Sequence, residues 1–152
     1  MDALEKLLAI EEIRQLEARR LRCIDEKNWL GYAACHAPDA VSYTFQALGA
    51  SETSIVGADN IAAQVAKQTG ESITVNQVHE PEIEITSEST ATGIWPVENR
   101  IWTQKPDGVQ WMQAHGHYHE TFVKVDGRWL IQSRRVKRLK SDNGFLPGGQ
   151  AP

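Results

Sequence analysis

Residues 109–139, VQWMQAHGHYHETFVKVDGRWLIQSRRVKRL, carry the pattern that decides the fold class. Val109 to Val125 and Trp129 to Leu139 are long runs rich in β-branched and aromatic residues, which favour strands. Asp126-Gly127 stands between them, and a glycine there accepts the positive φ of a tight hairpin turn without steric cost. The stretch therefore predicts two long antiparallel strands joined by a tight turn.

The residues before this hairpin predict two more strands. Thr90 to Thr103 has strand composition, and Lys105-Pro106-Asp107-Gly108 leads from it into the hairpin as a turn, because proline presets φ and glycine supplies positive φ. Ile73 to Thr86 alternates with period two, although Pro81 indicates an edge position or a bulge. We therefore predict an antiparallel meander of four long strands.

The first part of the chain carries mainly helical periodicity. Ala3 to Lys27 places apolar residues at helical spacing among glutamates and arginines. We expect further helices from Asn28 to about Cys35 and from Asp59 to Lys67. Between these two, Val41 to Phe45 alternates like a strand, and Gly49 to Gly57 has the composition of a loop.

Helices followed by a meander indicate a single α+β domain. The 152 residues fit one domain, which we place at residues 1–140, followed by an irregular C-terminal tail at 141–152 that is rich in glycine and proline. A sheet of such long strands must curl. We therefore expect a curved antiparallel sheet around the long N-terminal helix, with an apolar pocket between them.

Composition argues against several classes of function. The net charge of −4 without a basic block disfavours a nucleic-acid partner, and no apolar run approaches the roughly 20 residues of a membrane span. The amphipathic N-terminus is unlike a signal peptide, so we expect a cytoplasmic protein. Neither a P-loop nor a glycine-rich dinucleotide motif is present, and we expect no cofactor. Cys23 and Cys35 fit no metal-binding spacing and are expected to be reduced thiols.

Four short stretches occur in a characteristic order. They are EIRQL at 12–16 with CIDEKNW at 23–29, APDA at 37–40, HEPEIEI at 79–85 with ATGIW at 91–95, and GHYHE at 116–120 with DGRWLI at 126–131. Together they resemble the SnoaL-like branch of the nuclear-transport-factor-two-like superfamily. The resemblance implies a cone-shaped α+β barrel. It also implies a small enzyme without a cofactor that moves protons on a hydrophobic substrate and assembles as a homodimer or homotrimer.

Asp25 is the strongest candidate for chemistry. It follows Ile24 on the apolar face of the first helix, and a carboxylate at the rim of an apolar pocket is suited to act as a general base or acid. The alternative is an aspartate at the helix end that is either solvated or caps the helix starting near Asn28. The resemblance implies the first role, since relatives pair an acid at this position with a histidine from the facing sheet.

The position that the family pattern gives to that histidine holds Asn76, counted back from Pro81. Asparagine takes up no proton at neutral pH, but it orients substrates and donates hydrogen bonds to an oxyanion. His79 is a possible substitute if a bulge at Pro81 turns it inward. His36 is a second histidine that points inward or is simply a hydrogen-bonded buried residue.

His115, His117 and His119 share one face of a strand, because alternate residues point the same way. The family register places this face on the convex side of the sheet, where subunits of relatives meet. No carboxylate or cysteine pattern accompanies the three histidines, so we expect an interface rather than a metal site.

The same register predicts the residues that line the pocket. Besides Asp25, Asn76, His79 and His36 they are Tyr43, Trp95, Val97, Asn99, Gly116, Tyr118 and Arg134. Tyr118 is expected to hold a carbonyl or hydroxyl of the substrate, and Gly116 to leave room for a flat ring.

These residues favour a cofactor-independent lyase or isomerase in which Asp25 abstracts a proton, acting on a hydrophobic, ring-bearing small molecule. The alternatives are a member of the same fold that binds a small molecule without catalysis, which Asn76 favours, and an epoxide hydrolase that uses Asp25 with an arginine and a second acid.

Overall fold

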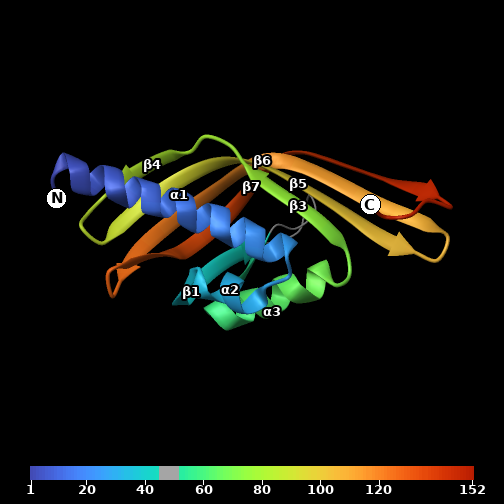
Figure 1. The fold of residues 1–152 in the computed structure, drawn as a ribbon, viewed down its shortest axis with the longest axis horizontal. Coiled ribbons are helices and arrows are strands. Elements are labelled where there is room, and N and C mark those ends of the chain that lie inside the picture. Colours follow the sequence, from blue (N-terminus) through green and yellow to red (C-terminus); the bar gives the residue numbers. More distant parts are fainter. Residues whose placement is uncertain (45–51) are drawn as a thin grey trace.

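The computed structural model describes residues 1–44 and 52–152, and three long strands dominate it (Figure 1). They are β5 (Thr90–Lys105), β6 (Gly108–Val125) and β7 (Arg128–Pro147), paired antiparallel in sequence order. The predicted hairpin is confirmed: Asp126 and Gly127 have φ of 50° and 76° in the turn between β6 and β7. The order of strands in the sheet is β2-β1-β7-β6-β5-β3, and β4 also pairs with β5.

The sheet is mixed and open rather than fully antiparallel and closed. β1 (His36–Thr44) runs parallel to β7, whereas β2 (Thr53–Val56) runs antiparallel to β1. The predicted loop at 49–57 is therefore wrong for residues 53–56, and Phe45 lies outside the described residues. β1 begins earlier than predicted, and its pairing with β7 shifts between His36 and Val41, where Pro38 interrupts the ladder.

The expected strand from Ile73 to Thr86 is divided at Pro81. β3 (Ile73–Val78) pairs with the second half of β5, and β4 (Glu82–Ile85) pairs with its first half. The missing N–H of proline accounts for the break, which the sequence indicated.

The prediction of an irregular tail is wrong as far as Pro147. Residues 141–147 continue β7 and pair with the first residues of β6, down to Pro147 opposite Gly108. A Cβ at Gly144 would come within 2.7 Å of the Trp111 ring, so the glycine allows close packing of strand on ring. It is no sign of a loop.

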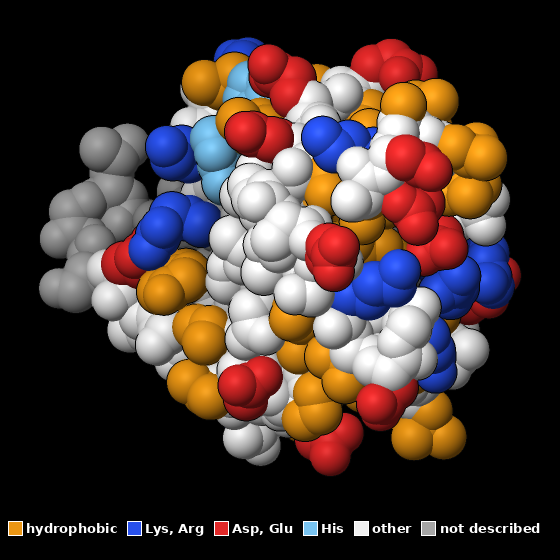
Figure 2. Space-filling model, turned by 90° about the vertical axis from the view of Figure 1, so that its left-hand side faces the viewer, with side chains coloured by type: hydrophobic (Ala, Val, Ile, Leu, Met, Phe, Trp, Pro, Cys, Tyr) orange, Lys and Arg blue, Asp and Glu red, His pale blue; other side chains and the backbone are white. Residues whose placement is uncertain are grey.

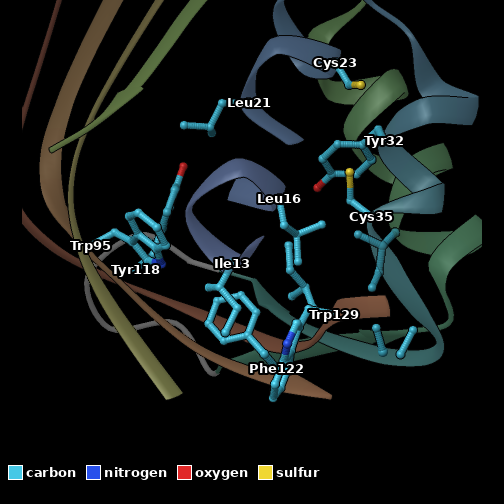
Figure 3. Packing of buried hydrophobic residues seen from close by; sticks show 14 of the residues in the cluster. Ile13, Leu16, Leu21, Cys23, Tyr32, Cys35, Trp95, Tyr118, Phe122 and Trp129 are labelled. Atoms are coloured by element: carbon cyan, nitrogen blue, oxygen red, sulfur yellow. The ribbon is translucent and has the colours of Figure 1, made fainter. Parts of the chain in front are cut away.

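The long helix α1 (Ala3–Asp25) lies across the sheet (Figure 1). Asp2 and Glu5 form a reciprocal capping box that satisfies backbone N–H groups at its start. Its buried apolar residues are Ala9, Ile13, Leu16, Leu21, Cys23 and Ile24. Figure 3 shows Ile13 and Leu16 packed against Phe122 and Trp129 of the sheet, and this interface forms the core.

Two short helices lie beside β1, near the C-terminus of α1 (Figure 1). α2 (Trp29–Ala34) is capped by Asn28, whose side chain accepts from the Gly31 N–H at 2.9 Å. α3 (Ala58–Thr69) ends at Gly70, close to the predicted bounds. No helix among residues 1–44 and 52–152 combines the length and the hydrophobicity that crossing a membrane requires.

Candidate active site

A cavity of about 400 Å³ lies between the helices and the concave side of the sheet. Its wall combines aliphatic side chains from α1, α3 and the strands with the phenols of α2, β1 and β6, the amides of α3, β3 and β5, and arginines from β5 and β7. The lining residues are Ile24, Tyr32, Ser42, Tyr43, Ile55, Ile61, Gln64, Val65, Gln68, Thr69, Thr74, Asn76, Asn99, Arg100, Ile101, Met112, Tyr118, Arg134, Val136 and Arg138.

Asp25 ends α1 and lies against β3, just behind this wall. Its Oδ1 accepts from Thr74 Oγ1 at 2.9 Å and from Asn76 Nδ2 at 2.6 Å, and its Oδ2 accepts from the Asn76 backbone N–H at 3.1 Å. A carboxylate offers about four acceptor positions, so one on Oδ2 remains. Asn28 caps α2, and the capping alternative for Asp25 is therefore wrong.

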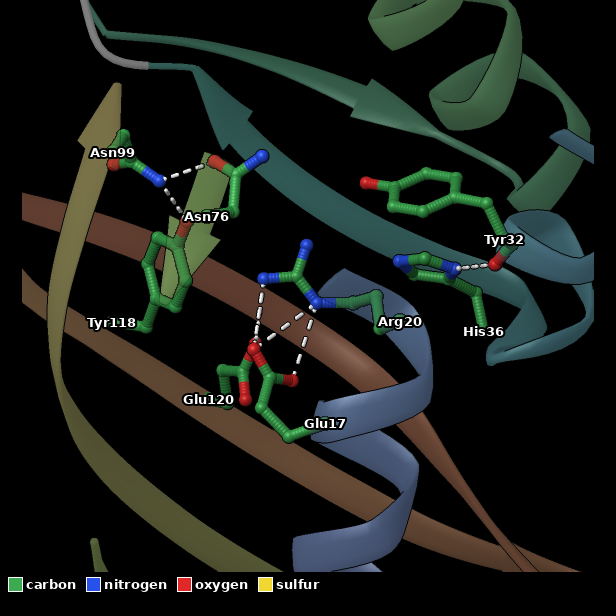
Figure 4. Close-up of polar contacts among 8 residues, drawn as sticks. All are labelled: Glu17, Arg20, Tyr32, His36, Asn76, Asn99, Tyr118 and Glu120. Carbon is green, nitrogen blue, oxygen red and sulfur yellow. Dashed lines mark hydrogen bonds and ion pairs between the residues drawn. The ribbon is translucent and has the colours of Figure 1, made fainter. Parts of the chain in front are cut away.

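Asn76 on β3 links Asp25 to side chains of β5 and β6. Asn99 Nδ2 donates to Asn76 Oδ1 at 2.6 Å and to the Tyr118 hydroxyl at 3.1 Å (Figure 4). The two asparagines are direct partners in the β3–β5 ladder, which brings their side chains together. Because the Tyr118 oxygen accepts from Asn99, its own proton remains available to donate to a ligand.

Two arginines flank the Tyr118 ring. The guanidinium carbon of Arg134 lies 4.9 Å from the ring centroid and that of Arg20 lies 5.0 Å from it. Arg134 comes from β7 and lines the cavity, as predicted from the register. Such cation–π contacts fix the ring and place positive charge beside the hydroxyl.

Arg20 belongs to a buried charged cluster that the sequence analysis did not identify. Its Nη2 donates to Glu17 Oε1 at 2.9 Å, and its Nε lies 3.2 Å from both oxygens of Glu17 (Figure 4). Glu120 from β6 approaches the same Nη2 at 4.0 Å. Burial, followed by the negative charge of Glu17, raises the pKa of Glu120 well above its usual value.

A signal for this cluster was present in the helical periodicity. Glu17 and Arg20 stand three residues apart, next to Leu16 and Leu21 in the apolar stripe of α1, so both face the sheet. Burial has the largest effect on Arg20 and would lower its pKa, but the neighbouring Glu17 contributes to a pKa that lies well above the usual value.

The two candidate histidines lie elsewhere. His79 Nε2 is 2.8 Å from Glu98 Oε2, and its side chain is 57 % exposed. His36 is buried with its Nδ1 2.8 Å from the Tyr32 carbonyl oxygen, and burial together with Arg20 lowers its pKa to about 3. Within the described part of the chain, neither ring hydrogen-bonds to Asp25.

Three of the other predicted pocket residues have different surroundings. Trp95 and Val97 are buried in the core beside the cavity rather than in its wall. A Cβ at Gly116 would lie 2.2 Å from the Lys137 carbonyl oxygen, at the point where the β6–β7 pairing shifts. Gly116 therefore permits the close approach of two strands, and the expectation that it widens the pocket for a ring is wrong. Tyr43 lines the cavity as expected.

His115, His117 and His119 are half-buried, whereas the residues between them are buried, which agrees with the predicted alternation. Over residues 1–44 and 52–152, no three histidine, cysteine or acidic side chains lie close enough together to hold a metal ion.

Solved structures share this architecture. A putative scytalone dehydratase from Novosphingobium aromaticivorans has a TM-score of 0.74 at 19 % identity, covering 99 % of this chain and 100 % of that one. The type-3 hexachlorocyclohexane dehydrochlorinase from Novosphingobium barchaimii has a TM-score of 0.71 at 17 % identity, with 99 % of both chains covered. A Mycobacterium tuberculosis protein of unknown function has a TM-score of 0.72 at 19 % identity, covering 92 % and 78 %.

At these identities the likeness is one of fold. The family assignment comes from the sequence, because the pattern of the SnoaL-like domain matches residues 5–135 and so spans most of the chain. This chain belongs to the SnoaL-like domain family.

Proposed function

We propose that this protein is a cofactor-independent lyase or isomerase that acts on a small, ring-bearing hydrophobic molecule with a carbonyl or hydroxyl oxygen. The observation that carries the proposal is the continuous polar network from Asp25 through Asn76 and Asn99 to Tyr118, which borders a cavity that aliphatic side chains also line. Such a network aligns one carboxylate and one phenol on the same bound molecule.

Asp25 and Tyr118 take complementary roles in this reaction. The open acceptor position on Asp25 Oδ2 takes a proton from a carbon next to the substrate carbonyl, approached between Thr74 and Asn76. The electron pair left behind moves to the carbonyl oxygen, which accepts a hydrogen bond from the Tyr118 hydroxyl. The electron pair then returns from the oxygen to form a carbon–carbon double bond as a β-hydroxyl departs as water with the proton that Asp25 took, or as another leaving group departs as its anion. In an isomerisation, Asp25 instead returns the proton to a different carbon.

Asn76 orients Asp25 rather than sharing its proton. Its backbone and side-chain N–H groups both donate to the carboxylate, and the amide has no basic nitrogen. The proton therefore remains on Asp25 until the substrate or water takes it. This arrangement suits a single-base reaction.

Deuterium exchange tests the proposal before a substrate is known. Cyclic ketones and β-hydroxy ketones are incubated with the protein in D₂O, and loss of the α-proton signal is followed by NMR. We expect exchange that Asp25→Asn slows by about a hundredfold or more and Tyr118→Phe slows by about tenfold or more. Equal exchange rates in wild type and Asp25→Asn would refute Asp25 as the base.

One observation favours a second candidate, binding without catalysis. None of the described residues in the cavity wall is an aspartate, glutamate or histidine, and Asp25 lies behind Thr74 and Asn76. Ketones that bind the wild-type protein without any exchange would establish this function instead. An epoxide hydrolase requires a second acid beside Asp25, and Glu120 is placed instead beside Arg20 and Glu17.

A further inference from the structure

We call the part of the cavity next to α1 and α2 its inner end. Two hydrogen-bond donors there, one in the wall and one behind it, have no partner within the described part of the chain. They are Nη1 of Arg20 and the hydroxyl of Tyr32, and both side chains are fully buried, at 0 % exposure. An unpaired buried donor costs stability in the free protein, more so when it is charged. A pair of such donors therefore indicates that a ligand binds next to them and accepts their hydrogen bonds.

Both donors point toward the same space. Figure 4 shows the end of the Arg20 guanidinium turned away from Glu17, toward the space between Asn76 and Tyr32, and the Tyr32 hydroxyl directed there as well. The guanidinium carbon lies 5.9 Å from the Tyr32 ring centroid and 5.0 Å from that of Tyr118. Tyr32, Asn76 and Tyr118 all line the cavity, with Arg20 directly behind.

The charged side chains in the described cavity wall are all cationic, although the chain carries a net charge of −4, and the nearby Asp25 carboxylate already accepts from Thr74 and Asn76. Arg100, Arg134 and Arg138 line the cavity, and its described wall contains no acidic side chain. Glu17 balances Arg20 through three short contacts. Burial and the charge of Glu17 raise the pKa of Glu120, which favours its neutral form, so that it cancels little of the remaining positive charge.

We infer that the natural ligand is an amphipathic carboxylic acid, whose carboxylate sits at this inner end and accepts from Tyr32, Arg134 and the free end of Arg20. A planar carboxylate matches the paired N–H geometry of a guanidinium. The apolar part of the acid lies along the aliphatic wall. This inference rests on the proposed small-molecule pocket and deepens it, because it names the ligand class.

Matched acids and ketones provide the test. The probes are 2-naphthoate with methyl 2-naphthyl ketone, and cyclohexanecarboxylate with methyl cyclohexyl ketone, titrated by calorimetry. In each pair the apolar body is the same, and a charged carboxylate oxygen takes the place of the methyl group of the ketone. We expect the wild-type protein to bind the acid about tenfold or more tightly than the ketone, since hydrogen bonds to charged groups are the stronger ones.

Tyr32→Phe and Arg134→Gln locate the preference. Tyr32→Phe removes a hydroxyl with no partner in the free protein, so the melting temperature should stay the same or rise, whereas affinity for the acid should fall several-fold and affinity for the ketone should not. Arg134→Gln should lower affinity for the acid about tenfold or more. Lys137→Gln is the charge-matched control, because this exposed cation of β7 is absent from the cavity wall, and it should leave both affinities unchanged.

The outcomes separate the two proposals. Ketones that bind as tightly as the acids overturn the carboxylate subsite and leave the pocket and its proposed function standing. An acid preference that survives both Tyr32→Phe and Arg134→Gln also overturns the subsite. Failure of all four probes to bind overturns the small-molecule pocket itself, and the subsite with it.

Discussion

Glu120 is buried where an ionised carboxylate is unfavourable. It is 3 % exposed and lies near Arg20, which already pairs with Glu17 through its Nε and Nη2. Its raised pKa follows from burial and from the second carboxylate. The cluster thus combines one cation, one anion and one carboxyl group that favours its proton, and these groups support the ring of Tyr118 from behind.

This raised pKa predicts how stability depends on pH. The folded protein keeps the Glu120 proton at pH values where the unfolded chain has lost it, so the free energy of unfolding should fall as pH rises above 4.5. In Glu120→Gln this part of the pH dependence should disappear, and the variant should gain stability relative to wild type over the pH range above about 4.5. Urea unfolding across this range measures the difference.

The control for that measurement is Glu84→Gln, which changes an exposed carboxylate on β4. Its difference from wild type should stay nearly constant with pH. A Glu120→Gln curve that runs parallel to the wild-type curve would show that Glu120 is ionised in the folded protein.

At the scale of elements, the last seven residues of β7 stabilise the start of β6. Val109 is 1 % exposed, and it pairs with Leu146 at the far end of the β6–β7 ladder. β7 contributes residues to the cavity wall only as far as Arg138. The two halves of this strand therefore serve different purposes, one structural and one in the site.

A chain ending at Lys140 should therefore unfold more easily and still bind its ligand. Exposing Val109 alone should cost about 1.5–3 kcal/mol of the free energy of unfolding, and the lost ladder adds to it. Chemical denaturation compares this variant with a control that lacks only residues 150–152. Equal stability of the two variants would mean that residues 141–147 contribute nothing to the fold.

At the scale of the whole molecule, the convex side of β6 carries the histidine row together with half-buried Trp111. By contrast, basic and acidic side chains are interspersed over the end of the molecule where α1 begins, which Figure 2 shows. We propose that the convex side joins copies of this chain as a homodimer or homotrimer. A half-buried tryptophan beside a row of imidazole rings is the kind of aromatic surface that protein interfaces favour.

Light scattering of the purified protein tests this assembly. We expect a molar mass two or three times that of the 152-residue chain, and a shift toward the monomer in His117→Glu, because burying the introduced carboxylate at a symmetric interface costs its hydration and sets like charges of the copies near one another. Glu88→Gln is a control outside this face, at the β4–β5 turn, and should not change the mass. A monomeric wild-type protein would refute the proposed assembly.

The sequence by itself determined the elements whose signal is local. The Asp126-Gly127 turn, the stripe of α1 and the break at Pro81 depend on φ preferences and on side-chain period, which act over a few residues. The position of Asp25 at the end of α1 and the inward face of Tyr118 follow from the same periods together with the family resemblance.

Only the tertiary structure decided what these residues meet. That Asn76 holds Asp25, that Arg20 lies between Tyr32 and Tyr118, and that Gly116 sits under a strand backbone all depend on contacts between segments far apart in the chain. The parallel pairing of β1 with β7 and the extension of β7 are of the same kind. Strand register and burial determine such contacts, and both depend on how distant segments pack together rather than on the conformational preferences of any single segment.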